Sequence, residues 1–138
     1  MMLITTTLTA LTLTAPSVTL TVALDGVEAD RKGDVRCAVY DSALGFPGEG
    51  KPAALAAADR SAEEPSCTFT LPAPGTYAVA VMHDENGNQK VDQNLFGAPT
   101  EGWATSNNVT HAFRGPSFDE SKFIVPADGA SIRVIMHY

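Results

Sequence analysis

The chain has 138 residues, 44% of them hydrophobic and 18% charged, so it is long enough for one buried core and short for two domains. Its formal net charge is −7, and the longest run of basic residues is the pair Arg31-Lys32. Because a phosphate backbone attracts a concentrated basic surface, this composition argues against nucleic-acid binding.

Residues 1–15 resemble a short secretory signal peptide. The stretch carries no charge and mixes Leu, Ile and Ala with many threonines before Pro16. It lacks the basic start of a usual leader, and an unstructured or strand-forming tail is the alternative interpretation. No later stretch approaches the roughly 18 apolar residues that a membrane span needs. We therefore expect a periplasmic or secreted protein without a membrane span, in which residues 16–138 form a single domain.

Hydrophobic periodicity indicates strands over residues 18–24 and 34–40. In both stretches every second residue is apolar, which is the period of a strand with one buried face. The pattern then weakens between residues 43 and 65. There, Pro52 and the alanines that follow it through Ala58 predict a short helix, since proline is tolerated in a first helical turn.

Four further strands are predicted over residues 66–71, 76–83, 122–125 and 131–138. The second of these is apolar on both faces, which indicates a central strand covered on both sides. Residues 84–119 show little periodicity but contain large apolar side chains, so we expect one long irregular loop that packs on the domain. The fold class predicted is all-β: an antiparallel two-sheet β-sandwich with one long irregular loop.

The two cysteines, Cys37 and Cys67, each share a strand face with apolar neighbours. They could therefore meet in the core and form a disulfide, which typically stabilises a protein by roughly 2–4 kcal/mol. Two buried free thiols are the alternative, because free cysteine is often fully buried. The absence of a CxxC pair argues against a zinc ribbon or a thioredoxin-type redox motif.

Oxygen-bearing side chains alternate along the start of the predicted loop, a spacing that suits calcium, which accepts about 6–8 oxygen ligands. The predicted ligands are Asp84, Asn86, Asn88, the backbone carbonyl of Lys90, and Asp92, with Asn94, Glu101 or water completing the shell. Compared with an EF-hand, glycine comes too early and Leu95 replaces the bidentate glutamate, so we expect weak binding, on the order of 10⁻⁴–10⁻³ M. The alternative is a plain hairpin turn at Asn86-Gly87.

The same loop is rich in aromatic and amide side chains. We interpret Phe96, Trp103, Asn107 and Asn108 as a ligand-binding surface for a glycan or an envelope protein, because loops on a rigid scaffold commonly carry binding residues. The expected function is therefore an exported, non-catalytic module with a calcium-binding loop.

Catalytic alternatives rest on few residues. The three histidines form no zinc-binding pattern. Ser106, His83 and Asp92 could be written as a hydrolytic triad, but no GxSxG motif supports it. A metal-dependent hydrolase using His83, Asp84 and Glu101 remains an alternative, and so does a purely structural envelope protein.

Several motifs occur together in a recognisable order. The run at residues 71–81 (LPAPGTYAVAV) is followed by HDENGN, DQN, GAPTEGW and SNN, and it is preceded by AVYDS and GFP. In this combination the chain resembles the bacterial domain-of-unknown-function family 2141 over most of residues 18–136. The resemblance implies an exported bacterial protein with no assigned reaction. The PGxYxV strand is also similar to that of carboxypeptidase-regulatory-like and transthyretin-like sandwiches, which implies an accessory or binding module by fold analogy alone.

Overall fold

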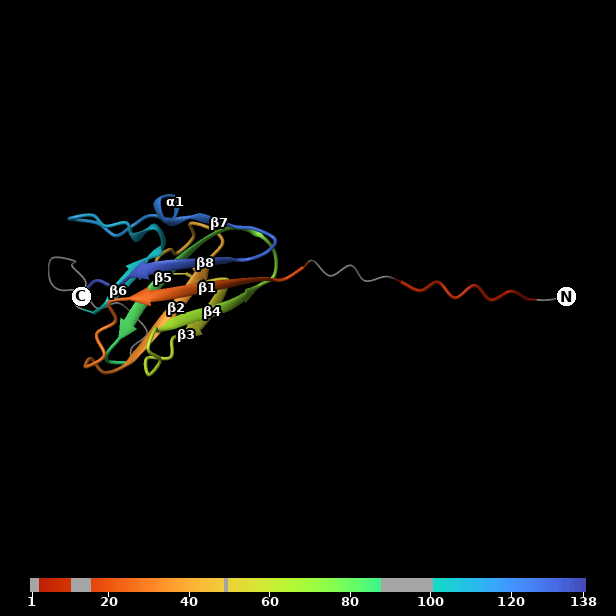
Figure 1. The fold of residues 1–138 in the computed structure, drawn as a ribbon. Coiled ribbons are helices and arrows are strands. Elements are labelled where there is room, and N and C mark those ends of the chain that lie inside the picture. The colour runs from red at the N-terminus through yellow and green to blue at the C-terminus, as the bar shows by residue number, and fades with distance from the viewer. Residues whose placement is uncertain (1–2, 11–15, 49, 88–100) are drawn as a thin grey trace.

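The computed structural model describes residues 3–10, 16–48, 50–87 and 101–138, and its elements form two packed sheets (Figure 1). The strands are β1 (Val18–Asp25), β2 (Asp34–Tyr40), β3 (Ala54–Ala57), β4 (Ser66–Leu71), β5 (Gly75–Asp84), β6 (Trp103–Thr105), β7 (Phe123–Val125) and β8 (Ala130–Ile135). The helical elements are η1 (Ser106–Asn108) and α1 (Phe118–Ser121). One sheet has the order β4-β1-β8 and the other β3-β2-β5-β6, with β7 paired to β5. The predicted all-β, two-sheet sandwich is confirmed.

The core lies between the sheets because the strands alternate as the sequence predicts. In β1, every second residue from Val18 to Leu24 is buried, and in β2 the residues Val35, Cys37 and Val39 are fully buried. Complete burial of such a side chain contributes about 1.5–3 kcal/mol. β5 is buried on both faces and lies between β2 and β6, so the prediction of a central strand is also confirmed.

A disulfide joins the two sheets. Cys37 of β2 and Cys67 of β4 are bonded, with their Cα atoms 6.5 Å apart. Both side chains are buried in the core cluster. The predicted bridge is confirmed, and the alternative of two free thiols is wrong.

The helix predicted after Pro52 is wrong. Residues 54–57 form strand β3, which pairs antiparallel with β2 from Arg36 to Val39. Alanine favours helices only weakly over other states, and pairing with a neighbouring strand outweighs that preference. Similarly, the stretch expected to be irregular contains the short elements β6, η1 and α1.

Helix α1 begins at a capping box formed by Ser117 and Glu120. Ser117 accepts a hydrogen bond from the backbone N–H of Glu120 at 3.3 Å, and the Glu120 carboxylate accepts one from the backbone N–H of Ser117 at 3.0 Å. This reciprocal pair is the capping box that begins many helices. Glu120 also binds Arg114, which contributes most to lowering the pKa of its carboxyl group below the usual value.

The two sheets are joined by backbone hydrogen bonds on one side of the sandwich. β1 pairs with β8 in parallel, the one departure from antiparallel pairing in the described ladders. Beyond β8, His137 forms a two-way backbone bridge with Trp103 of β6, with N–O distances of 2.8 and 2.9 Å. This bridge joins the two sheets, whereas β3 and β4 are the edge strands of the opposite side.

Residues 3–10 extend away from the sandwich (Figure 1). Their apolar side chains are exposed, including Leu3, Ile4 and Leu8. Within the stretches that the structure describes, no helix is long and apolar enough to cross a membrane.

Candidate functional site

Three buried polar residues lie near the two ends of the connection between β5 and β6. They are His83 and Asp84 at the end of β5, and Glu101 shortly before the start of β6. The exposed fractions of His83, Asp84 and Glu101 are 0%, 1% and 4%. The β5–β6 register pairs Met82 with Trp103, and the N–H of His83 donates to the carbonyl of Gly102 at 2.8 Å. Continued by one residue, that register places Asp84 opposite Glu101 at the two ends of the 85–100 connection.

Neighbouring strand residues point to opposite faces, so His83 and Asp84 do not share one. His83 has the same orientation as the core residues Val79 and Val81. Asp84 lies on the other face, in line with Asp34 of β2, its register partner. The two residues that the hydrolase alternative joins are therefore directed to different sides of the sheet.

Both ring nitrogens of His83 have partners. Nε2 lies 3.0 Å from the carbonyl oxygen of Lys32, and Nδ1 lies 2.7 Å from the hydroxyl of Tyr138. Because a carbonyl can only accept, Nε2 carries the proton, and Nδ1 then accepts from Tyr138. Burial, and next the nearby Arg60 guanidinium, lower the pKa of His83 below its ordinary value of 6.5, so the ring is neutral at pH 7.

Tyr138 completes this end of the sandwich. Its hydroxyl accepts a hydrogen bond from the backbone N–H of Glu28 at 3.2 Å, and its ring lies 4.5 Å beneath the Arg31 guanidinium. Gly102 leaves room for the ring, since a Cβ atom there would come within 2.3 Å of Cε1. Burial raises the pKa of the Tyr138 hydroxyl, which keeps it a proton donor to His83.

The segment that supplies the Lys32 carbonyl is held by Arg60. The Arg60 guanidinium donates to the backbone carbonyls of Ala29, Arg31 and Gly33. Gly33 has a φ of +91°, and a Cβ atom there would come 2.1 Å from the carbonyl oxygen of Asp84. Only glycine allows the two backbones to approach this closely.

Sequence reasoning did not find this supporting group. Tyr138, Arg31 and Arg60 come from three separate segments, and Tyr138 is far along the chain from the residues it contacts. Local patterns carry no signal for such contacts. The alternation that runs to the end of the chain indicated only that the last segment packs as a strand.

The predicted calcium ligands are placed only in part. Asn88, Lys90 and Asp92 lie outside the described residues. Asp84 is buried, while Asn86 is exposed beside Gly87, whose φ of +74° fits a turn. Among the residues that the structure does describe, no group of three or more His, Cys, Asp or Glu side chains is close enough to hold a metal ion. Calcium site and plain turn therefore both remain predictions.

Of the predicted ligand-binding surface, too, the structure describes only a part. Phe96 lies outside the described residues. Trp103 is half-buried, and its ring stacks on His137 with centroids 5.0 Å apart. The amide of Asn107 donates to the carbonyls of Glu120 and Lys122, and Asn108 accepts from the N–H of Ile135 at 2.9 Å. Asn107 thus joins η1 to the α1 segment, and Asn108 joins η1 to β8.

Ser106 does not lie beside His83. Its hydroxyl accepts from the N–H of Val79 at 2.9 Å and donates to the carbonyl of Ser121 at 2.5 Å. The third member of the hypothetical triad, Asp92, lies outside the described residues. Ser106 has the contacts of a structural serine that joins β5 to α1.

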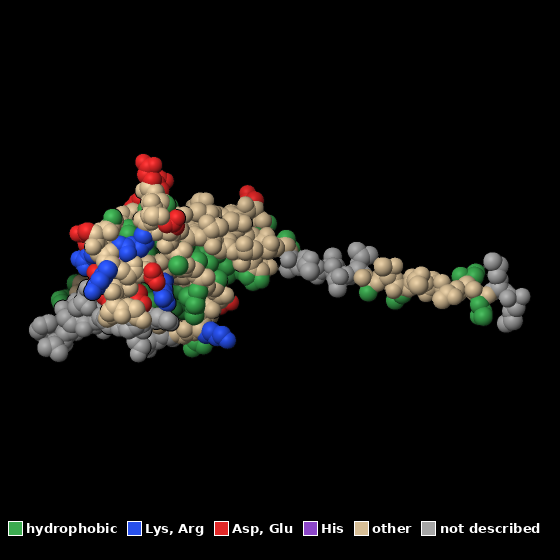
Figure 2. Space-filling model, turned by 90° about the horizontal axis from the view of Figure 1, so that it is seen from below, with side chains coloured by type: hydrophobic (Ala, Val, Ile, Leu, Met, Phe, Trp, Pro, Cys, Tyr) green, Lys and Arg blue, Asp and Glu red, His purple; other side chains and the backbone are tan. Residues whose placement is uncertain are grey.

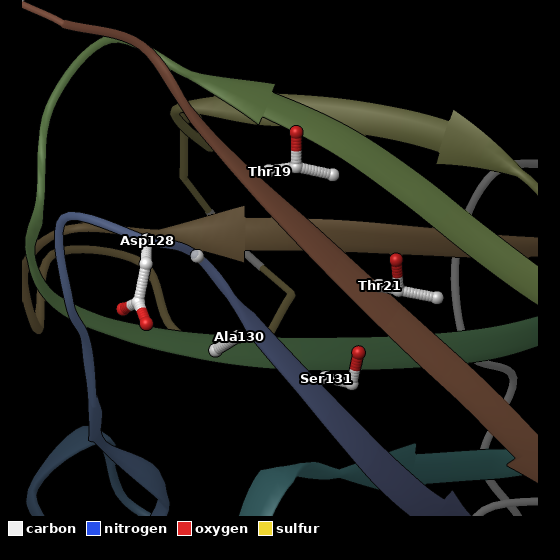
Figure 3. A pocket seen from close by; sticks show the side chains of 6 residues that line it. Thr19, Thr21, Asp128, Ala130 and Ser131 are labelled. Carbon is white, nitrogen blue, oxygen red and sulfur yellow. The ribbon is translucent and has the colours of Figure 1, made fainter.

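A shallow hollow lies elsewhere, on the outer face of the smaller sheet (Figure 3). It is lined by Thr19, Thr21, Asp128, Gly129, Ala130 and Ser131. The hydroxyls of Thr19, Thr21 and Ser131 point to the same side, but a single carboxylate accompanies them. The hollow brings together no acid–base pair or basic group that would define a ligand.

Comparison with known proteins identifies the family. The model of the family described as uncharacterized protein conserved in bacteria (DUF2141) matches residues 22–133, most of the chain. The chain belongs to the DUF2141 family. The match runs from β1 into β8 and includes the cysteine pair, the buried polar residues and the β5–β6 connection.

Membership in DUF2141 confirms the resemblance noted from the sequence motifs. The family description assigns no reaction or ligand. No curated protein and no solved structure matches this chain. The function of this DUF2141 protein is thus to be inferred from its own residues.

Proposed function

We propose that this protein is an exported, non-catalytic β-sandwich module whose β5–β6 connection binds calcium and presents a surface to a glycan or an envelope protein. The observation that carries the proposal is the placement of Asp84 and Glu101. Both carboxylates are buried, and the strand register sets them opposite each other at the two ends of the connection.

Carboxylate pairs of this kind suit a hard cation. Calcium binds carboxylate, amide and carbonyl oxygens with flexible geometry. The sequence supplies such oxygens at Asn86, Asn88, Lys90 and Asp92, between the two carboxylates. In this proposal Asp84 and Glu101 are ligands at the closed end of the loop, and bound calcium would draw the ends of the connection together.

The proposal is tested by thermal unfolding in EDTA and in millimolar calcium. A ligand that binds only the folded state raises the midpoint, so we expect a calcium-dependent rise in the wild-type protein. Asp84→Asn and Glu101→Gln should each reduce that rise. Asp119→Asn, which alters an exposed acid on α1, is the matched control and should respond as the wild type does. Equal midpoints with and without calcium would refute calcium binding.

Trp103 is the best-supported part of the proposed partner surface. It is an aromatic ring fixed by a backbone bridge and by stacking on His137, and a fixed ring loses little freedom on binding. We expect Trp103→Ala to reduce capture of a glycan or envelope partner in a glycan array or envelope pull-down. Phe113→Ala is the control, since Phe113 is fully exposed on another segment. An unchanged binding profile for Trp103→Ala would count against this surface.

Export is supported by the disulfide and by the leader-like residues 1–15. Structural disulfides persist in oxidising compartments and are rare in the cytosol. Cell fractionation of the full chain, compared with a chain that begins at Pro16, tests this part. Recovery of both in the cytosol would contradict export.

The contacts of His83 favour a non-catalytic role over the hydrolase alternative. A general base needs a free lone pair facing the substrate, whereas His83 is fully buried and uses both nitrogens internally. Turnover of an ester, glycoside or phosphate substrate that His83→Ala abolishes, in a variant shown to be folded, would revive that alternative. A purely structural envelope protein would show neither a calcium shift nor a partner.

A further inference from the structure

Over residues 54–57 the free edge of the larger sheet is available for strand pairing. β3 is the edge strand, and the N–H of Ala58 donates to the carbonyl of Val35 at 2.8 Å. In an antiparallel ladder the backbone N–H and C=O groups of successive residues point to opposite sides of the strand. Those of Ala54, Ala56 and Ala58 therefore point toward β2. The N–H and C=O groups of Leu55 and Ala57 therefore point outward, and the structure forms no hydrogen bond to them.

Natural edge strands are usually protected by charged residues, proline or a bulge. β3 has no charge and no proline, and Leu55 is 71% exposed. In Figure 1, β3 lies at the lower margin of the sandwich, and Figure 2 looks at the molecule from below, where apolar side chains gather on the surface. The opposite edge differs, because β6 is joined there to the other sheet through Trp103 and His137.

We propose that β3 pairs antiparallel with β3 of a second copy of this chain, forming a two-fold symmetric dimer. Centred on Ala56, this pairing sets Leu55 of each copy opposite Ala57 of the other. Each of these residues then donates and accepts one backbone hydrogen bond across the axis. The two larger sheets become one continuous sheet, and each Leu55 side chain is covered by the other copy.

Charges at the two ends of β3 favour this partner and this direction. Lys51 precedes the strand and Asp59 follows it. In this register Lys51 of one copy lies diagonally across from Asp59 of the other, and opposite charges across neighbouring strands stabilise the pair. Parallel pairing would instead place lysine beside lysine. A symmetric contact of this kind uses the same patch on both subunits.

The contact is short, so the dimer should be weak. The strand spans residues 54–57, and the area it buries falls below the roughly 1,200–2,000 Å² of stable interfaces. We expect a dimer fraction that rises with protein concentration. Because β2 separates β3 from β5, which carries Asp84, we expect the same association in EDTA and in calcium, and this separates it from the proposed function.

Sedimentation velocity over a concentration series tests the proposal. Leu55→Lys places a charge on the edge, and Ala57→Pro removes an outward N–H without touching the hydrogen bonds to β2. Both variants should remain monomeric where the wild type dimerises. Leu44→Lys is the matched control, because Leu44 is 81% exposed but lies outside the strand, and it should dimerise as the wild type does.

Three results would overturn the proposal. The first is a wild-type chain that stays monomeric at the highest concentration at which it remains in solution. The second is a dimer that persists in both edge variants. The third is a dimer lost equally in Leu44→Lys and Leu55→Lys, which would indicate general apolar association instead of strand pairing.

Discussion

At the scale of single residues, the polar end of the sandwich depends on a chain of hydrogen bonds with one possible direction. Lys32 offers only a carbonyl, so His83 must donate from Nε2 and accept from the hydroxyl of Tyr138. The backbone N–H of Glu28 donates in turn to that hydroxyl. A second proton on His83 would put two donors between the histidine and the tyrosine, so the neutral ring is part of the fold.

The protonation of His83 predicts an acid-sensitive stability. Its pKa in the folded protein is below the ordinary value of 6.5, so the unfolded chain takes up this proton first as the pH falls. Well above pH 6.5, His83 is neutral in both states and does not change the stability. As the pH falls from 6.5 to the lower pKa of the folded protein, the free energy of unfolding should decrease. Denaturant midpoints measured from about pH 7.5 to about pH 5 should show this decrease.

The contribution of His83 is separated from that of other groups by substitution. His83→Gln, less stable at neutral pH, should have a shallower dependence over the same range. A slope equal in wild type and His83→Gln would show that other groups cause the acid sensitivity.

Gly102 allows a second residue-scale prediction. A methyl group at this position would lie 2.3 Å from Cε1 of Tyr138 and 2.8 Å from Cζ, so the ring would have to leave its place. Gly102→Ala should destabilise the protein by about 1–3 kcal/mol, as overpacking does elsewhere. Gly48→Ala is the control, since a Cβ there meets nothing within 4 Å. Equal unfolding midpoints for both variants would contradict the contact.

At the scale of elements, the sequence predicted strands well where the two faces differ or where both are apolar. β1 and β2 have strict alternation, and β5 has apolar residues on both faces, so their existence and burial followed from the pattern. β3 was not predicted because its alanines and leucine are all apolar, so its two faces do not differ in polarity. β6 spans only residues 103–105, too few to show a period.

The candidate site was predictable to a lesser degree. The carboxylate and amide spacing after β5 indicated a cation-binding loop, and Glu101 was among the residues expected to complete it. That Asp84 and Glu101 face each other follows from strand pairing, which no local pattern encodes. The amides of Asn107 and Asn108 bond to backbone groups, a role that the sequence pattern does not distinguish from ligand binding, so their place in a binding surface stays a prediction.

The link between β2 and β4 gives the element-scale prediction. Removing the Cys37–Cys67 bond should lower the free energy of unfolding by about 2–4 kcal/mol, because the unfolded chain gains freedom. Denaturant unfolding with and without reductant measures this loss. The Cys37→Ala/Cys67→Ala variant should show no further effect of reductant. Equal stability of the oxidised and reduced wild type would contradict a stabilising bridge.

At the scale of the whole molecule, residues 3–10 lie apart from the sandwich. They are exposed throughout and extend away from the domain. The core cluster begins at Val18, and the family match begins at residue 22. Folding should therefore depend only on the part of the chain from Pro16 onward.

Truncation tests this independence. A chain that begins at Pro16 should unfold at the same temperature and denaturant concentration as the full chain, because residues 3–10 are exposed and the core cluster begins at Val18. Circular dichroism of both chains during heating provides the comparison. A lower midpoint for the shorter chain would show that residues 1–15 contribute to stability.

The two connections between the sheets differ in chemistry and lie on opposite sides of the sandwich. Backbone hydrogen bonds between Trp103 and His137 close one side, while a covalent bond between Cys37 and Cys67 holds the other. A reducing environment removes only the second. In the reduced protein the β3–β4 side would be held by core packing alone, so the redox state of the surroundings would decide how readily that side opens to proteases.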